Sequence, residues 1–250
     1  MFREIIKQVL AFFDYELRRR SRYFVDAFQD QKKLLQQQHV KCIFDCGANI
    51  GQTTAKYKQL FPNATIYSFE PTQETFDVLC QTFKSDELVK PQQLSVSNLT
   101  GHQQFFVYKD SQLNSLSAID SQSDRYMLSL SDSVEYTKVE SITLDEFCER
   151  EKIKEIDILK MDIQGSELLA LQGAVGLLKK QEISLIYLEI FFGQLYDHQA
   201  NFHEINKLLQ EYNYILYGVY NLTRLSDGTL GYGDAIFISS DIKNKLPPFL

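Results

Sequence analysis

Two acidic residues, each directly after a short apolar segment, are the first candidates for chemistry in this chain. Asp45 follows the apolar residues 42–44, and Glu70 follows a second apolar run at 64–69. Between the two acids, a Gly-x-x-x-Gly turn leads into a predicted helix at about residues 52–60. The order of strand, glycine turn, helix and strand is typical of a nucleotide-binding unit, in which the ligand lies against the turn.

The glycine turn favours one kind of ligand over another. Gly47 can adopt a positive φ or let a ligand approach the backbone, and Gly51 lets the helix start pack tightly on the strand. Asn49 occupies the place where a dinucleotide fold has its second glycine, so the NAD fingerprint is incomplete. The carboxylate of Asp45 suits a ligand with an ammonium group, whereas it would repel a pyrophosphate.

Glu70 adds a second constraint on the ligand. It lies about 20 residues beyond Gly51, where an acid can accept hydrogen bonds from both hydroxyls of a ribose. The turn, an ammonium-binding acid and a ribose-binding acid together predict S-adenosylmethionine as the cofactor. Ser97, at the end of a predicted third strand at 90–97, could meet the adenine edge. The alternative is that Asp45 caps a helix and Glu70 is a solvated strand end.

A second stretch, DILKMDIQGSE, places further carboxylates at strand ends. Residues 156–161 form a predicted buried strand that ends at Asp162, and Glu167 begins a predicted helix at 167–178. A later apolar strand contains Glu189 near its end. In a doubly wound sheet, the carboxyl ends of strands one and four adjoin where ligands bind. The acid after the first strand and Asp162 are therefore expected to face one crevice.

Asp162 and Glu189 are the candidate catalytic pair. Two carboxylates on adjacent strand ends can act as a general base, or can hold a divalent cation such as Mg²⁺ that acidifies a hydroxyl. His198 is a further candidate base and Glu167 a further candidate carboxylate, although a structural or solvent-facing role is common for such a histidine. We expect His203 to lie on a helix surface.

Composition limits the classes of protein that need to be considered. The chain has 250 residues, of which 44% are hydrophobic, enough to bury one sizeable core. Its net charge is −7 and its pI is about 5.2, so nucleic acid is not expected as a partner. The four cysteines form no C-x-x-C pair, which favours reduced thiols over a zinc site or a disulfide framework and predicts a cytoplasmic location.

The N-terminal part of the chain predicts a helical extension at 1–38 before a catalytic domain at 39–250. Charges interrupt its apolar residues too early for a signal peptide, and no run reaches the length of a membrane span. The arginines at 18–22, beside aromatic residues, could touch a membrane surface or an acidic partner. The alternative is a helix packed over the catalytic domain, or against a second subunit in a homo-oligomer.

The remaining pattern predicts an α/β fold with a doubly wound, mostly parallel sheet that ends in an antiparallel hairpin. Strands are expected at 104–108, 139–143, 183–190, 214–219 and 235–238, and a short helix at 144–151. Residues 109–134 are rich in Ser, Asp, Asn and Gln, so they form either an active-site lid or an inert surface insertion. Gly173 lies inside the predicted helix at 167–178, where close packing would explain it.

Taken together, these stretches resemble the FkbM family of methyltransferases, within the class I S-adenosylmethionine-dependent methyltransferases. The similarity runs in order through FDCGANIGQ, FEP, SITLDEF, DILKMDIQGSE, QGA, YLEI and GDAIFI, over about residues 40–240. It implies a Rossmann-like seven-stranded sheet and S-adenosylmethionine-dependent O-methylation, commonly of a sugar or secondary-metabolite hydroxyl. The acceptor is thus expected to be a small molecule or a glycan.

The resemblance and the residues lead to the same assignments. Cofactor binding is assigned to Asp45, Gly47, Asn49, Gly51, Glu70 and Ser97, and catalysis to Asp162, Glu189 and His198. A nicotinamide-dependent oxidoreductase is one alternative, which Asn49 and Asp45 disfavour. A non-catalytic cofactor-binding scaffold with the same fold is another, which the retention of the loop acids disfavours.

Overall fold

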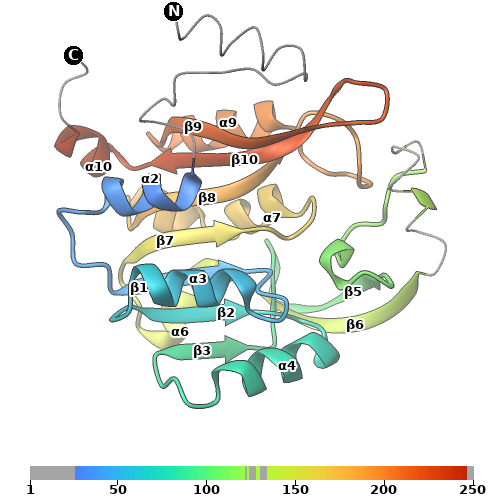
Figure 1. The fold of residues 1–250 in the computed structure, drawn as a ribbon, viewed down its shortest axis with the longest axis horizontal. Coiled ribbons are helices and arrows are strands. Elements are labelled where there is room, and N and C mark those ends of the chain that lie inside the picture. Colours follow the sequence, from blue (N-terminus) through green and yellow to red (C-terminus); the bar gives the residue numbers. More distant parts are fainter. Residues whose placement is uncertain (1–25, 122, 124–127, 130–133, 247–250) are drawn as a thin grey trace, which may run out of the picture.

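The structure of the protein is a computed structural model that describes residues 26–121, 123, 128–129 and 134–246. Its centre is a seven-stranded sheet in the order β3-β2-β1-β7-β8-β10-β9 (Figure 1). In that order the strands are Val89–Gln92, Thr65–Phe69, Cys42–Cys46, Ile156–Met161, Ile183–Phe191, Leu230–Ile238 and Ile215–Arg224. β10 runs antiparallel to both of its neighbours, and the other neighbouring pairs are parallel. The predicted doubly wound sheet with a final antiparallel hairpin is confirmed.

The order of the strands reverses between β1 and β7. The chain builds β1, β2 and β3 toward one edge, and later builds β7 and β8 toward the other. At such a reversal, the carboxyl ends of the two central strands leave a crevice. The predicted adjacency of the two acid-bearing strands is confirmed, because Asp45 pairs in register with Lys160 and the Asp162 N–H donates to the Cys46 carbonyl at 3.1 Å.

Helices cover both faces of the sheet because successive strand residues point to opposite sides. On β1, Ile43 packs into one apolar cluster and Phe44 into the other. The Ile43 side, toward the viewer in Figure 1, carries α2 (Ala27–Leu34), α3 (Gln52–Leu60) and α10 (Ser240–Lys245). The Phe44 side carries α6 (Leu144–Glu151), α7 (Glu167–Gln172), α8 (Val175–Lys179) and α9 (Phe202–Glu211). The helix α4 (Gln73–Phe83) packs beside β3.

The predicted N-terminal helical extension can be followed from residue 26 onward. Asp26 caps α2, because its carboxylate accepts two backbone N–H groups of the first turn at 2.9 and 3.2 Å. Leu34 and Leu35 are buried against the sheet, so the described part of the extension packs over the catalytic domain. Residues 1–25, with the arginine cluster, lie outside the described residues. Within the described ranges, no helix is both long and apolar enough to cross a membrane.

The predicted third strand at 90–97 is two separate strands. β3 ends at Gln92, and the chain then forms β4 (Ser95–Val96) in a second sheet of order β4-β6-β5. In this second sheet β6 is Glu135–Ile142 and β5 is Gly101–Val107. The break occurs because β2 ends at the partner of Gln92, and the next residues pair with β6 instead.

The predicted helix at 167–178 is broken into α7 and α8. The Asp145 carboxylate, from the start of α6, accepts two backbone N–H groups of the first turn of α8 at 2.7 and 2.9 Å, which stabilises a second helix start. Gly173 lies at the break, and a Cβ atom there would be 2.2 Å from the Ser97 carbonyl oxygen. Close packing as the reason for this glycine is thereby confirmed.

We expect Gly173→Ala to lower the free energy of unfolding by about 1–3 kcal/mol, because the added methyl group meets a backbone carbonyl rather than a movable side chain. Urea unfolding followed by circular dichroism measures the change. The control is Gln172→Ala at the adjacent, solvent-exposed position, where the expected change stays within about 0.5 kcal/mol. Equal stability of Gly173→Ala and the wild type would contradict the packing role.

Candidate functional site

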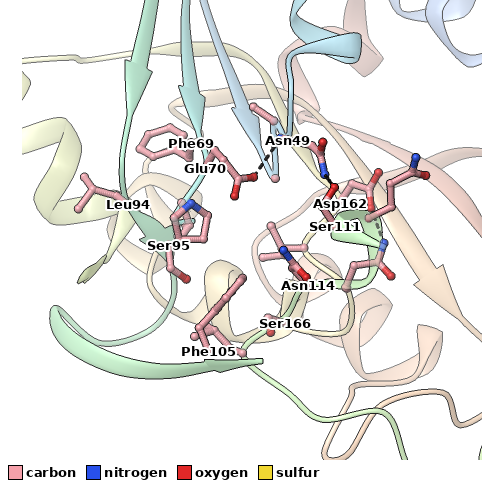
Figure 2. Close-up of a pocket in the computed structure, with 18 of the residues that line it drawn as sticks. Asn49, Phe69, Glu70, Leu94, Ser95, Phe105, Ser111, Asn114, Asp162 and Ser166 are labelled. Atoms are coloured by element: carbon pink, nitrogen blue, oxygen red, sulfur yellow. Dashed lines mark hydrogen bonds between the residues drawn. The ribbon is translucent and has the colours of Figure 1, made fainter. Parts of the chain in front are cut away.

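A cavity of about 390 Å³ opens at the carboxyl ends of β1, β2 and β7, where the strand order reverses. In Figure 2, the apolar side chains of Phe69 and Leu94 lie on one side of this cavity. Polar side chains lie on the other side, namely those of Asn49, Ser111, Asn114 and Asp162. The carboxylate of Glu70 lies between the two groups. The cavity therefore has one side suited to an apolar ring and another suited to hydrogen bonds.

The glycine turn lines the cavity at the end of β1. Gly47 has φ 75°, and a Cβ atom there would lie 1.9 Å from the Asp162 carbonyl oxygen, so only glycine fits between the two strand ends. Asn49, with φ 50°, presents its side chain to the cavity. Gly51 begins α3 with φ 96° and faces side chains of α4 instead, so it shapes the turn without lining the cavity.

Glu70 is held in place from both sides. One carboxylate oxygen accepts the Asn49 N–H at 3.1 Å, and the other accepts the hydroxyls of Thr72 at 2.5 Å and Thr75 at 2.7 Å. Glu70 is only 5% exposed, which excludes the alternative of a solvated strand end. Its carboxylate borders the cavity from a fixed position, as a ribose-binding acid requires.

Asp45 lies behind the cavity wall and does not line the cavity. Its side chain is fully buried and accepts the Thr54 hydroxyl at 2.7 Å, while its second oxygen pairs with Lys160 Nζ at 3.0 Å. It does not cap α3, whose N-cap residue is Gly51. The structure thus differs from both sequence-based expectations for Asp45, because a cation on the neighbouring strand already neutralises its carboxylate.

Lys160 is one of several residues of this site that carry no signal in the sequence. Its Nζ also donates to the carbonyl oxygens of Cys46 at 3.3 Å and Gly47 at 3.1 Å. Burial on its own lowers the pKa of a lysine, but the carboxylates of Asp45 and Asp162 outweigh that effect and raise the pKa of Lys160 above its ordinary value. Lys160 therefore carries a permanent charge beneath the glycine turn.

Gln164 joins the two candidate catalytic carboxylates. Its side-chain nitrogen donates to Asp162 Oδ1 at 2.7 Å and to Glu189 Oε2 at 3.1 Å, and its side-chain oxygen accepts the Tyr196 hydroxyl at 2.5 Å. Its backbone has φ 54°, a strained value for a residue with a side chain. Asp162 lines the cavity with a side chain that is 48% exposed, whereas Glu189 lies behind Gln164 and does not line it. The structure therefore brings the pair together but leaves only Asp162 at the cavity.

Glu167 and Glu189, whose carboxyl groups lie behind Asp162, have raised pKa values. Burial raises the pKa of Glu167 to about 7, although the backbone N–H groups it accepts, such as that of Ile163 at 3.0 Å, partly oppose the shift. Burial also raises the pKa of Glu189 well above its ordinary value, and the charges of Asp162 and Glu167 add to this effect. The buried Glu167 and the half-buried Glu189 therefore bind protons more tightly than exposed carboxyls do.

Two further predicted site residues, Ser97 and His198, do not line the cavity. Ser97 is fully buried. Ser95 and Val96 line the cavity instead, because the chain leaves the central sheet before Ser97. His198 is exposed, in a left-handed turn with φ 57°, and does not line the cavity. His203 lies exposed on α9, as predicted.

The start of the predicted lid closes the polar side of the cavity. Ser111, within the short 3₁₀ helix η1 (Ser111–Leu113), accepts the Asn49 side-chain N–H at 3.0 Å. Ser115 donates its hydroxyl to the Gln164 carbonyl at 2.6 Å, so this segment touches both strand-end loops. The polar composition of 109–134 is compatible with a lid or with an inert insertion, and the place of its described residues over the cavity follows only from the fold. Residues 122, 124–127 and 130–133 of this stretch lie outside the described residues.

A metal centre is not supported by the side chains that the structure places. Across the described ranges, no group of three or more His, Cys, Asp or Glu residues is arranged to hold a metal ion. The divalent cation considered from the sequence therefore stays a prediction.

The protein has the class I methyltransferase fold, because its seven strands have the order described and its cavity lies at the point where this order reverses. The sequence profile of the Methyltransferase FkbM domain matches residues 45–216. The chain belongs to this family, and the resemblance found in its motifs is confirmed.

Two known proteins illustrate the similarity. "Methyltransferase 1" from Beauveria bassiana is 26% identical over 144 residues, which are 52% of this chain and 57% of that protein. The crystal structure of the methyltransferase FkbM from Methylobacillus flagellatus is 13% identical with a TM-score of 0.51, and the match covers 80% of this chain and 44% of that one. The chain thus spans about half the length of these proteins, and at such identity the second likeness shows the fold alone.

Glu167 gives the site a pH-dependent stability. Its pKa is about 7 in the folded protein and 4.5 in a free side chain, so the folded state keeps a proton that the unfolded state releases. The stabilisation is present below pH 4.5 and is lost as the pH rises through 7, by about 3 kcal/mol. We expect Glu167→Gln to remove this loss.

Urea unfolding of the wild type and Glu167→Gln at pH 5 and pH 8 measures the difference. The variant should gain stability relative to the wild type at pH 8. Glu149→Gln, which removes an exposed carboxylate of α6, is the control and should show no such gain. A pH-independent difference between Glu167→Gln and the wild type would contradict the raised pKa.

Proposed function

We propose that the protein is an S-adenosylmethionine-dependent O-methyltransferase that acts on a hydroxyl of a small polyhydroxylated molecule, such as a sugar or a glycan. The observation that carries the proposal is that Glu70 and Asp162 line one cavity together with Gly47 and Asn49 of the glycine turn. Membership of the methyltransferase family supports the reaction class.

Successive parts of the cavity wall fit the adenine, the ribose and the methionine end of S-adenosylmethionine. Phe69, Leu94 and Phe105 supply apolar surface for the adenine ring, and Glu70 can accept the ribose hydroxyls. The turn at Gly47 and Asn49 lies next to the ribose acid, where the methionine end would lie. The cofactor supplies an electrophilic methyl group, and the protein supplies orientation.

The polar side of the cavity fits an acceptor with several hydroxyl groups. Asn49, Ser111, Asn114 and Gln164 offer amide and hydroxyl groups that can both donate and accept hydrogen bonds. Asp162 lies among them and is the proposed general base. Gln164 donates to Asp162 Oδ1, which keeps that oxygen unprotonated and leaves Oδ2 to take the acceptor proton.

The segment around Ser111 and Ser115 supports this chemistry by covering the polar side. It limits the access of water, which would otherwise compete with the acceptor for hydrogen bonds. Glu189 acts through Gln164 in this proposal, and His198 has no role. The cytoplasmic location, the contact of the N-terminal helices with a membrane surface and a homo-oligomeric state stay predictions from the sequence.

The cofactor assignment is tested by calorimetry. We expect S-adenosylmethionine or its demethylated product to bind at micromolar levels, with no heat from NAD. Glu70→Ala should weaken this binding by about 1.5–3 kcal/mol, because it removes charge-assisted hydrogen bonds. Glu74→Ala, an exposed carboxylate in the first turn of α4, is the matched control and should bind like the wild type. Binding of NAD alone would refute the methyltransferase proposal.

The base assignment is tested with Asp162→Asn, which keeps the shape of the side chain and removes its charge. Transfer of labelled methyl groups to a panel of monosaccharide glycosides should fall by about 10²–10⁴-fold, the range typical of general base catalysis, while cofactor affinity stays unchanged. His198→Asn is the control and should keep full activity. Full activity of Asp162→Asn would remove Asp162 from catalysis, and loss of wild-type activity with a chelator would favour the cation instead.

A further inference from the structure

Lys160 is a buried cation at the cavity wall to which the proposed reaction gives no role. It is 3% exposed and lies opposite Asp45 in the register of β1 and β7. Its Nζ lies 3.0 Å from Asp45 Oδ1 and 3.9 Å from Asp162 Oδ2, and it donates to the Cys46 carbonyl at 3.3 Å and the Gly47 carbonyl at 3.1 Å. Two of the three ammonium protons thus go to these carbonyls, and the carboxylates balance the charge.

Through its two carbonyl contacts, Lys160 holds the backbone at the start of the glycine turn. Cys46 is the last residue of β1 and Gly47 is the first residue of the turn, so their peptide groups set the direction in which the chain leaves the strand. Hydrogen bonds from a charged donor are worth more than those between neutral groups. Lys160 therefore fixes two consecutive peptide groups at the point where the methionine end of the cofactor would lie.

Asp45 completes the same arrangement from behind. Its charge balances Lys160, and its second oxygen accepts the Thr54 hydroxyl, which lies 2.9 Å from the hydroxyl of Ser68. A buried charge is stabilised by a partner of opposite sign, and Lys160 has a second one, because Asp162 Oδ2 lies 3.9 Å from its Nζ, whereas Lys160 is the cation that pairs with Asp45. The acid that the sequence offers to the cofactor instead holds a lysine that shapes the turn.

We propose that Lys160 is a positioning residue for the cofactor, which holds the turn through the carbonyls of Cys46 and Gly47 in the shape that receives the methionine end. This inference rests on the proposed function, because it takes S-adenosylmethionine as the ligand. It predicts that Lys160 affects cofactor affinity beyond its effect on stability. A merely structural ion pair would change stability alone.

The chain contains a second ion pair between a lysine and a buried aspartate, which serves as a control although its lysine is half exposed. On α2, Lys33 Nζ lies 2.9 Å from an oxygen of Asp30, which is 1% exposed, and neither residue lines the cavity. Lys33→Met therefore removes a lysine from a buried aspartate away from the turn. Its effect on cofactor affinity should be small, within about twofold.

The experiment uses double variants, because Lys160→Met alone leaves a buried carboxylate unpaired and risks unfolding. Asp45→Asn keeps the lysine and its two carbonyl contacts, whereas Asp45→Asn with Lys160→Met removes both charges and the donors. Titration calorimetry measures the affinity of each variant for S-adenosylmethionine and S-adenosylhomocysteine, and thermal melting without ligand measures stability. We expect Asp45→Asn to bind within about threefold of the wild type and the double variant at least tenfold more weakly, in line with lost charged hydrogen bonds.

A second double variant keeps the test valid if the first does not fold. Asp45→Asn with Lys160→Gln retains a side-chain amide donor, so its affinity should lie between those of Asp45→Asn and the methionine double variant. If either double variant binds both ligands as tightly as Asp45→Asn, Lys160 does not position the turn and the inference is overturned. An equal loss of affinity in Lys33→Met would overturn it as well.

The failure of the proposed function would look different. In that case the wild type itself would bind neither ligand, and the inference would fall with the proposal. Binding by the wild type with no difference between Asp45→Asn and the double variants would leave the proposed function intact and would overturn only the role of Lys160.

Discussion

The site depends on how closely the ends of β1 and β7 approach each other. The Asp162 carbonyl lies where a side chain at Gly47 would begin, and the Asp162 N–H donates to the last carbonyl of β1. The glycine turn and the acid-bearing loop therefore form one continuous edge. Glu70 joins this edge from β2, because its carboxylate accepts the N–H of Asn49. The three strand ends reach the cavity as one connected unit rather than as three independent loops.

Charge is distributed unevenly around this edge. Among the described residues that line the cavity, Lys160 is the cation, and it is already paired with Asp45. Asp162 and Glu70 face the cavity, and the carboxyls of the buried Glu167 and the half-buried Glu189 lie behind Asp162 with raised pKa values. The open side of the site therefore presents acids, which suits a ligand that carries a positive centre.

The sequence predicts the central sheet well because its signals are local. Apolar runs that end in an acid, such as those before Glu70 and Asp162, mark strand ends, and the glycine spacing marks the turn. The order of these units then predicts the reversal point without any knowledge of distant contacts. The placement of Glu70, Gly47 and Asp162 at one cavity follows from this order alone.

The parts that were missed depend on contacts between distant segments. Nothing local in the sequence shows that the chain leaves the sheet after Gln92 to pair with β6, and this departure decides where Ser97 lies. The pairing of Asp45 with Lys160 depends on the register of β1 and β7, which the sequence does not state. Gln164 and Ser111 carry no catalytic signature, and they matter only because the fold brings them to the same rim.

The segment over the polar side is fastened differently from the rest of the site. Bridges at Phe106–Ser115 and Ile119–Tyr196 anchor it, while among its described residues the side-chain hydrogen bond to the glycine turn is the one from Asn49 to Ser111. Such a bond contributes about 0.5–1.5 kcal/mol net, because water can replace it. The strand ends at the base of the cavity are tightly packed, whereas the segment at its rim is held to the glycine turn by this hydrogen bond. The described part of this segment can therefore vary in sequence with little effect on the sheet beneath it.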